Sequence, residues 1–237
     1  MLALMGGTPR SGTTWITHIA QNILIRKGWT YDTVNANAPM EVRNAVLSHV
    51  VGGNRIIHFH SIIPLVIRMA QTRQAVVWYA FRDPGDIVVS QMRLRDIGFD
   101  QALNMASAAL ADLNKAIQNP EIHLIPYATL LDAPQVYVFQ MARSFGISLS
   151  SAEVEAVVAA CSFEKNKEAV ARLKAGQGNF KERDTGTRRM RSDPETLLTD
   201  RHIQSGQPGR WREELTDDQQ RVIETSFKAY YEVFQGF

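Results

Sequence analysis

The start of the chain constrains the fold most, because a short apolar run there meets a glycine-rich loop and then a helical pattern. The run from Leu2 to Met5 predicts a buried strand, and Gly6 and Gly7 open the loop. Apolar residues at spacings of three and four follow and predict a helix that ends near Gly28. Such a loop gathers backbone N–H groups at the positive end of the helix dipole. We therefore predict a phosphate-binding loop between the first strand and the first helix.

Strand and helix patterns alternate along the rest of the chain, which predicts a parallel sheet with helices on its faces. The predicted strands cover 2–5, 55–60, 75–81 and 121–126. After the first helix, the predicted helices begin at Pro84, cover about 100–118, 134–145 and 151–161, and run from about Thr216 to the end of the chain. We expect a single α/β domain over residues 1–237.

The composition fits a globular protein and excludes several other classes. Of 237 residues, 45% are hydrophobic and 21% are charged, which excludes disorder and collagen-like repeats. The net charge of +2 is too small to indicate a nucleic-acid partner. One cysteine forms no internal disulfide, and no apolar run approaches the ~18 residues of a membrane span. The start of the chain lacks the features of a signal peptide, so a cytoplasmic location is expected.

A basic segment stands out in the second half of the chain. Nine basic and three acidic residues lie between Lys165 and Arg191. Two interpretations stay open: a solvated surface loop, or a mobile basic lid over an anionic ligand that spans about 165–205.

The loop from Gly7 to Thr14 departs from the ATP-binding pattern G-x-x-x-x-G-K-[ST] at one position. Both glycines match, and Thr14 matches the hydroxyl position. Thr13 stands at the lysine position, so the loop lacks the cation that reaches the β- and γ-phosphates. The positive charge lies instead at Arg10, where it can face a bridging oxygen as a leaving group departs.

The stretch T-P-R-S-G-T-T-W (8–15) resembles Y-P-K-S-G-T-T-W, the 5′-phosphosulfate loop of the cytosolic-type sulfotransferases. These enzymes use 3′-phosphoadenosine-5′-phosphosulfate (PAPS) and release adenosine 3′,5′-bisphosphate (PAP). The resemblance implies that Arg10 replaces the loop lysine and that Trp15 stacks on adenine. It implies that the rest of the loop also binds the cofactor: Ser11, Gly12, Thr13 and Thr14. The chain starts shortly before this loop, so a short, bacterial-like form of the family is expected.

A second stretch, F-R-D-P-G-D-I-V-V-S (81–90), resembles the family's 3′-phosphate motif C-R-N-x-x-D-x-x-V-S. Arg82 follows a predicted strand, where its guanidinium can bind a phosphate through two donors. Ser90 lies about two turns along the next helix. The resemblance implies that its hydroxyl contacts the same phosphate.

Three weaker matches follow in the family's order. The resemblance implies that Tyr127 contacts adenine. It also implies that C-S-F at 161–163 corresponds to the family's T-S-F, which assigns Cys161, Ser162 and Phe163 to the cofactor site. Phe163 is then the second ring that stacks on adenine. The segment G-Q-P-G-R-W (206–211) resembles the end of the family's closing motif, R-K-G-x-x-G-D-W.

The closing motif departs from the family at its two cations, which are Gln204 and Ser205 here. The resemblance still assigns Gln204, Ser205 and Gly206 to the cofactor, but these side chains bring no charge to the 3′-phosphate. Either the phosphate is bound by Arg82 and Ser90 alone, with modest affinity, or another arginine supplies the charge. The candidates are Arg188, Arg189, Arg191 and Arg201.

Sulfuryl transfer is an in-line displacement, so the acceptor needs a base and the leaving group needs cations or N–H donors. His60 ends a predicted strand, at the sheet edge where α/β folds bind ligands. The stretch H-F-H-S-I-I-P (58–64) resembles the family's K-T-H-L-P. This implies that His60 is the base and that His58 replaces a lysine that stabilises the transferring group. The strand's period of two places both histidines on one face, and no metal is implied.

The leading prediction is therefore a PAPS-dependent sulfotransferase that acts on a hydroxyl or an amine of a small molecule. A P-loop kinase of a small metabolite is disfavoured by Thr13. A nucleotide-binding module without chemistry is disfavoured by His60.

The acceptor itself is not predicted beyond its broad class. Its pocket is expected from 30–55, 62–72 and 93–104, whose mixed composition fits a phenol, an alcohol, a sugar or an amine. The family's dimer patch, K-x-x-x-T-V-x-x-x-E, is not matched between Arg212 and Arg221, so the oligomeric state stays open.

Overall fold

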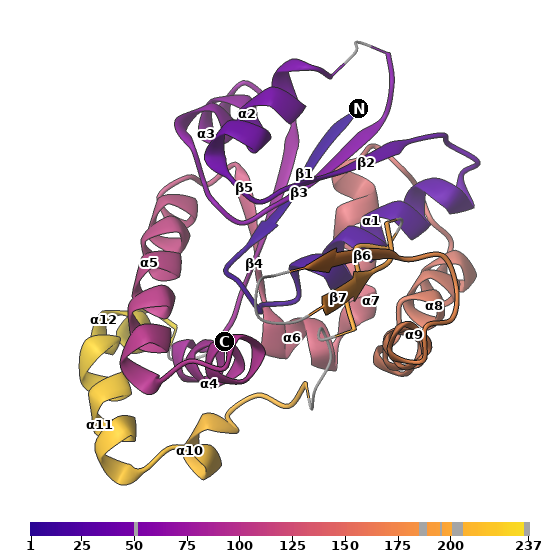
Figure 1. The fold of residues 1–237 in the computed structure, drawn as a ribbon. Helices are drawn as coiled ribbons and strands as arrows, with labels where there is room; N and C mark the ends of the chain where they lie inside the picture. Colours follow the sequence, from indigo (N-terminus) through magenta and orange to yellow (C-terminus); the bar gives the residue numbers. More distant parts are fainter. Residues whose placement is uncertain (50–51, 185–188, 195, 201–205, 235–237) are drawn as a thin grey trace.

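The computed structural model describes residues 1–49, 52–184, 189–194, 196–200 and 206–234 (Figure 1). Its centre is a 5-stranded parallel sheet with the strand order β2-β3-β1-β4-β5. The strands are β1 (Leu2–Gly7), β2 (Asp32–Ala36), β3 (Arg55–Phe59), β4 (Val76–Phe81) and β5 (Ile122–Pro126). This confirms the predicted α/β architecture, with the phosphate loop directly after the first strand.

Helices cover both faces of the sheet, and each face has its own core (Figure 1). Met5, Ile16 and Trp78 belong to one core, whose principal helices are α1 (Thr13–Arg26), α7 (Pro134–Ser144) and α8 (Ser151–Ala160). Leu4 and Val77 belong to the other, whose principal helices are α2 (Pro39–Leu47), α3 (Pro64–Gln71), α4 (Pro84–Arg95) and α5 (Phe99–Ile117). The inner strands β1 and β4 contain no charged residue because both of their faces are covered.

The edge strand β2 has no sequence pattern that predicts it. Its five residues, D-T-V-N-A, are mostly polar, and only Ala36 is buried. It pairs with β3 alone, from Asp32 opposite Arg55 to Ala36 opposite Phe59. An edge strand needs no continuous apolar run, because one side of it meets no further strand.

The basic segment is not a continuous loop, so the interpretation as a solvated surface loop is wrong, whereas the mobile basic lid stays a prediction. Residues Phe163–Lys174 form helix α9, which buries Val170 and Leu173 one turn apart. Strands β6 (Lys181–Asp184) and β7 (Arg189–Ser192) then pair in an antiparallel hairpin. The hydroxyl of Ser162 starts the helix, because it accepts a hydrogen bond from the backbone N–H of Lys165.

The C-terminal helical stretch begins as predicted but does not continue as one helix. Thr216 and Gln219 form a capping box at the start of α11 (Asp217–Ser226). The helix stops at the buried Phe227, and α12 (Lys228–Val233) follows in a new direction (Figure 1). Two short helices complete the fold: α6 (Tyr127–Asp132) and α10 (Trp211–Glu214).

Candidate active site

The loop between β1 and α1 is held tightly against β4. The backbone N–H of Thr8 donates to the carbonyl of Ala80 at 3.0 Å. Arg10 and Gly12 both have a positive φ, of 71° and 88°, so the chain curls back before α1 begins. A Cβ at Gly7 would lie 2.5 Å from Thr13 Oγ1, which leaves room only for glycine. The loop therefore has a fixed shape before any ligand binds.

Ser11 is buried inside this loop. Its hydroxyl oxygen lies 2.6 Å from the carbonyl oxygen of Thr8 and 2.9 Å from that of Ala80, so its single proton is shared between the two acceptors. Its backbone N–H donates to the Thr8 carbonyl as well. The sequence assigns Ser11 to the cofactor, but in the structure its side chain contacts backbone carbonyls and stabilises the loop.

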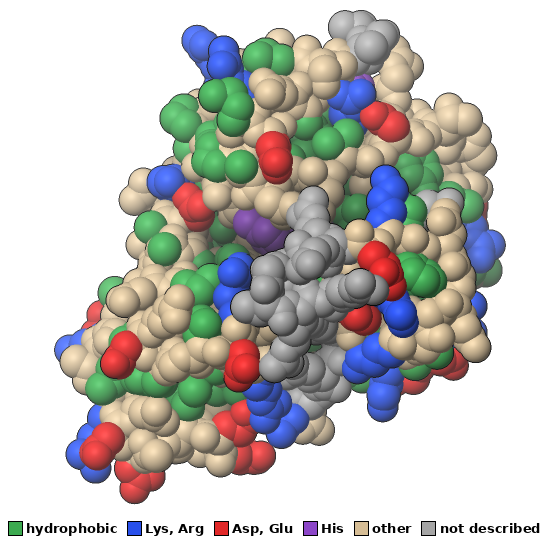
Figure 2. Space-filling view, in the orientation of Figure 1, with side chains coloured by type: hydrophobic (Ala, Val, Ile, Leu, Met, Phe, Trp, Pro, Cys, Tyr) green, Lys and Arg blue, Asp and Glu red, His purple; other side chains and the backbone are tan. Residues whose placement is uncertain are grey.

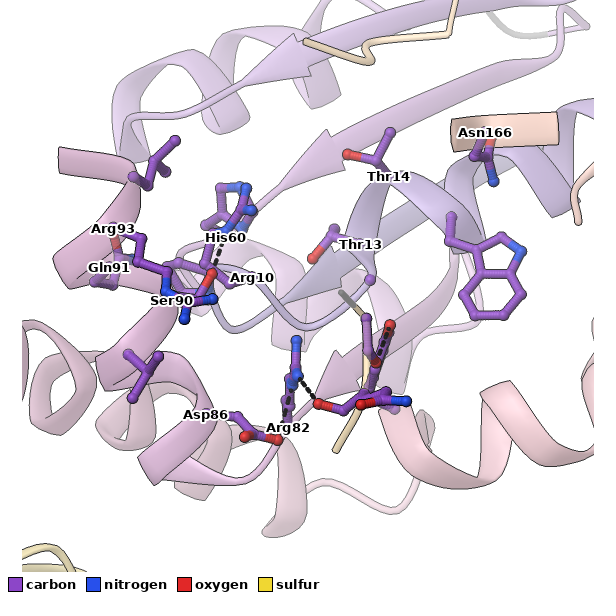
Figure 3. Close-up of a pocket in the computed structure, with 18 of the residues that line it drawn as sticks. Arg10, Thr13, Thr14, His60, Arg82, Asp86, Ser90, Gln91, Arg93 and Asn166 are labelled. Atoms are coloured by element: carbon purple, nitrogen blue, oxygen red, sulfur yellow. Dashed lines mark hydrogen bonds and ion pairs between the residues drawn. The ribbon is translucent and has the colours of Figure 1, made fainter. Parts of the chain in front are cut away.

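A cavity of about 540 Å³ lies at the carboxyl ends of the strands, in front of this loop. It opens on a face where acidic and basic side chains surround a hollow that exposes a histidine (Figure 2). The structure brings most of the predicted site residues to its wall: Arg10, Gly12, Thr13, Thr14, Trp15, His60, Arg82, Ser90, Tyr127, Phe163 and Gly206. Residues far apart in the sequence thus share one cavity (Figure 3).

Arg10 and Ser90 meet inside the cavity. The Nε of Arg10 donates to the hydroxyl of Ser90 at 2.8 Å. Burial, together with the nearby charge of Arg82, lowers the pKa of Arg10 to about 10. Arg10 remains a cation at neutral pH, and burial makes an anionic partner favourable.

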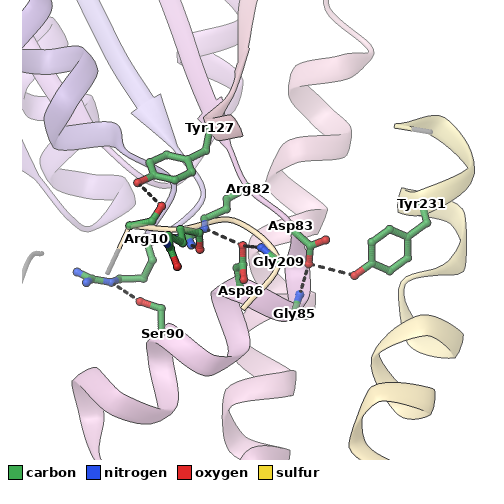
Figure 4. A network of polar contacts seen from close by, with 11 residues as sticks. Arg10, Arg82, Asp83, Gly85, Asp86, Ser90, Tyr127, Gly209 and Tyr231 are labelled. Atoms are coloured by element: carbon green, nitrogen blue, oxygen red, sulfur yellow. Dashed lines mark hydrogen bonds and ion pairs between the residues drawn. The ribbon is translucent and has the colours of Figure 1, made fainter. Parts of the chain in front are cut away.

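Arg82 is fixed by three neighbours (Figure 4). Its Nε forms an ion pair with Asp86 Oδ2 at 3.2 Å, and a second nitrogen donates to the carbonyl of Gln207 at 2.9 Å. The guanidinium also lies 4.6 Å from the centroid of the Tyr127 ring. Asp86 accepts a further hydrogen bond from the backbone N–H of Gly209 at 2.9 Å. These contacts attach the 206–210 segment to the start of α4.

Aromatic rings form another part of the wall. The Trp15 and Tyr127 rings meet edge to face with centroids 6.3 Å apart. The hydroxyl of Tyr127 donates to the carbonyl of Gly206 at 3.0 Å. A Cβ at Gly206 would lie 2.5 Å from the Phe163 ring. The closing segment therefore packs directly against two of the predicted adenine-binding rings.

Cys161 and Ser162 do not line this cavity. Cys161 is buried in the core beneath α8, and burial raises the pKa of its thiol to about 12. Ser162 caps α9. Only Phe163 of the predicted C-S-F match reaches the cavity wall.

His60 lies directly after β3 and beside the phosphate loop. Its Nδ1 is 2.9 Å from the carbonyl of Gly7, which can only accept a hydrogen bond, so Nδ1 carries the proton. Burial lowers the pKa of His60, the charge of Arg10 lowers it further, and the Gly7 hydrogen bond acts in the opposite direction. The neutral ring therefore keeps Nε2 available as a proton acceptor.

His58 lies behind His60, away from the cavity wall. The two rings meet edge to face with centroids 5.0 Å apart, which confirms that they share one face of the strand. His58 is buried, and its Nδ1 contacts Asn35 Oδ1 of β2 at 3.0 Å. This geometry suits a residue that positions His60 rather than one that touches the transferring group.

The wall also includes His18, to which the sequence analysis gave no role, and Arg93, which it placed only in a range expected for the acceptor pocket. His18 of α1 contacts Asn166 Oδ1 at 3.1 Å through Nδ1 and the carbonyl of Thr196 through Nε2. Arg93 and Glu214 form an ion pair of 2.5 Å across the cavity edge. His18 lies one turn after Trp15, and Arg93 lies one turn after Ser90, so helical spacing from the recognised motifs was the available signal.

The replacement cations predicted for the closing motif are only partly described. Gln204, Ser205, Arg188 and Arg201 lie outside the described residues, as does the side chain of Arg189. Arg191 donates to the carbonyls of Leu173 and Lys174 at the end of α9 and pairs with Glu182. The Arg191 side chain therefore holds the hairpin against the end of α9.

Comparisons with known proteins identify the family. A family model for the sulfotransferase domain matches residues 3–236. The fold resembles retinol dehydratase in complex with androsterone and inactive cofactor PAP, with 14% identity, a TM-score of 0.68, and 97% of this chain and 80% of that chain covered. It also resembles mouse sulfotransferase SULT7A1 complexed with PAP, with 15% identity, a TM-score of 0.68, and 97% and 84% covered. A search of curated proteins gives no match.

The chain therefore belongs to the sulfotransferase domain family. This confirms the predicted class, a sulfotransferase, and does not favour the kinase or the binding module. Among the helices that the structure describes, none has both the length and the apolar character needed to cross a membrane.

Proposed function

We propose that this chain moves the sulfuryl group of PAPS to a hydroxyl or an amine of a small molecule, with His60 as general base and Arg10 beside the leaving group. The observation that carries this proposal is the contact of 2.9 Å between His60 Nδ1 and the carbonyl of Gly7. It ties the candidate base to the first residue of the phosphate loop. Base and leaving-group site are then held in a fixed relation, as an in-line displacement requires.

The residues of the cavity fit the cofactor in both charge and shape. Arg10 and the start of α1 offer cationic and N–H donors to the phosphosulfate. Arg82 offers a cation and Ser90 a hydroxyl to the 3′-phosphate. The ring of Trp15 offers a face on which adenine can stack. A Cβ at Gly12 would lie 3.0 Å from the Tyr127 ring, so glycine keeps this part of the cradle open. PAPS, when bound, supplies an activated sulfuryl group on a phosphate leaving group.

The chain's own contribution to catalysis divides between two residues. Nε2 of His60 takes the proton from the acceptor oxygen or nitrogen as it attacks, while Nδ1 stays hydrogen-bonded to Gly7. Arg10 offsets the negative charge that develops on the departing phosphate oxygen. His58 holds the His60 ring edge-on.

The test separates binding from turnover. His60→Ala should reduce sulfuryl transfer by about 10²–10⁴-fold, the contribution of a general base, while PAP binds with nearly unchanged affinity. Radiolabelled PAPS with a panel of phenols, alcohols, sugars and amines gives the rate, and calorimetry gives the affinity. The matched control is His123→Ala, because His123 is exposed on β5 and stacks on Trp78 away from the cavity. Near-wild-type turnover in His60→Ala would remove His60 from the mechanism.

The acceptor class rests on the family and on the cavity. Retinol dehydratase, which shares this fold, has been solved in complex with PAP and either retinol or androsterone, and both are small molecules with a hydroxyl. Asn37 and Ser61 give this cavity polar groups beside His60, which suits an acceptor with more than one polar group. A cytoplasmic location stays a prediction of the sequence.

A further inference from the structure

The wall of the cavity along α4 carries more positive charge than its own acidic residues offset. Asp86, Ser90 and Arg93 lie at intervals of four and three, so they share one face of the helix, and all three line the cavity. At one end of this face, Asp86 neutralises Arg82 at 3.2 Å. At the other end, Glu214 neutralises Arg93 at 2.5 Å. Ser90 lies between these two pairs.

Arg210 is a further cation on this wall. It lines the cavity, and its neighbour Gly209 donates to Asp86 at 2.9 Å, which holds the segment over the start of α4. One guanidinium nitrogen of Arg210 lies 3.1 Å from Glu214 Oε1. That contact lacks hydrogen-bond geometry, because Oε1 is buried without a hydrogen-bond partner among the described residues. The same carboxylate holds Arg93 more closely, so its charge is shared.

The segment therefore adds a cation to the same cavity wall that Ser90 lines. Gly209 contacts α4 at Asp86 (Figure 4). Glu214, which lies near Arg210, contacts α4 at Arg93. Asp86 and Arg93 lie on either side of Ser90 on this face of the helix. The two residues before Gly206 in the same segment, Gln204 and Ser205, carry no charge.

We propose that Arg210 binds the 3′-phosphate of the nucleotide and supplies the charge that the rest of the closing segment lacks. A phosphate monoester carries close to two negative charges at neutral pH, and the planar guanidinium matches two of its oxygens. Arg210 leaves Glu214 for this stronger partner, and Glu214 remains paired with Arg93. The inference rests on the proposed function, because it places the 3′-phosphate of PAP beside Arg82 and Ser90.

The test compares two ligands that differ only in the 3′-phosphate: PAP and adenosine 5′-monophosphate. Calorimetry on the full chain should show that Arg210→Ala weakens PAP binding by about tenfold to hundredfold, the effect of losing one charge-assisted contact. Binding of the monophosphate should change by less than about twofold. Arg210→Lys, which keeps the charge, should retain most of the preference for PAP. Arg221→Ala is the control, because it removes the same charge from an exposed pair with Asp218 on α11.

The outcomes separate this inference from the proposed function. If wild-type protein does not bind PAP, the proposed function itself fails. If wild-type protein prefers PAP and Arg210→Ala keeps that preference, Arg210 does not bind the 3′-phosphate. An equal loss for both ligands would also overturn the inference, because it would show that Arg210 only supports the fold of the segment.

Discussion

Arg10 donates from its Nε to the hydroxyl of Ser90 at 2.8 Å, across 80 residues of sequence. This contact joins the two motifs that were recognised separately, the loop after β1 and the helix after β4. β1 and β4 are neighbours in the sheet, so both motifs start at the same edge. The phosphosulfate and 3′-phosphate ends of the proposed cofactor are therefore linked through one protein hydrogen bond.

Ser90→Ala should weaken PAP binding by about tenfold and should also destabilise the fold by about 1–3 kcal/mol, because it leaves a buried donor of Arg10 without its partner. The variant removes a hydroxyl that orients a buried cation and that is itself proposed to contact a phosphate, and a hydrogen bond to a charged group is worth about 1.5–3 kcal/mol. Calorimetry with PAP measures the affinity, and urea unfolding measures the stability. Ser107→Ala is the control, because that hydroxyl bonds the Leu103 carbonyl on the exposed side of α5. Unchanged PAP affinity would show that Ser90 makes no functional contact.

Gly7→Ala should destabilise the fold by about 1–3 kcal/mol, the cost of overpacking a well-packed site. The added methyl group would lie 2.5 Å from Thr13 Oγ1 and 2.6 Å from the Ala80 carbonyl, and the carbonyl belongs to the backbone of β4. Thermal or urea unfolding measures the loss.

The matched control for this variant is Gly98→Ala. A Cβ there meets no atom within 4 Å, and φ is −72°, which any residue can adopt. We expect a loss of only roughly 0.5 kcal/mol, because alanine is a weaker N-cap than glycine. Equal losses in the two variants would contradict the view that the loop is tightly packed.

The sequence predicts the centre of this fold better than its edges. The strands β1 and β4 are free of charged residues because helices cover both faces, and the strands β3 and β5 are still mostly apolar, so these runs are visible without any structure. The edge strand β2 and the hairpin β6–β7 are built from polar residues, so only pairing in three dimensions defines them. The helix α9 was not predicted, because its charged residues outnumber the two apolar residues that it buries, Val170 and Leu173.

The sequence motifs predicted which residues gather at the candidate site. They did not predict where each side chain points. Ser11 and His58 belong to the motifs, yet the hydroxyl of Ser11 faces the backbone carbonyls of Thr8 and Ala80, and His58 lies behind His60. A spacing pattern tells which residues share an element and a face. It does not tell which of them a neighbouring carbonyl or amide engages. Arg210 and Glu214 were missed for the same reason, since their importance lies in a contact with α4.

The pH dependence of sulfuryl transfer should report His60. The pKa of this residue is lowered, chiefly by burial and also by the charge of Arg10, so the ring is neutral at and above pH 7. We expect kcat/KM to be constant from about pH 7 to 8 and to fall as the pH drops below the ordinary histidine value of about 6.5, because protonation of Nε2 removes the base. On the acidic side, kcat/KM should fall by nearly tenfold for each pH unit, because a single proton inactivates the base. His123→Asn should leave the profile unchanged, since His123 lies outside the cavity. A limb whose midpoint lies above pH 7 would mean that the essential base is a different group.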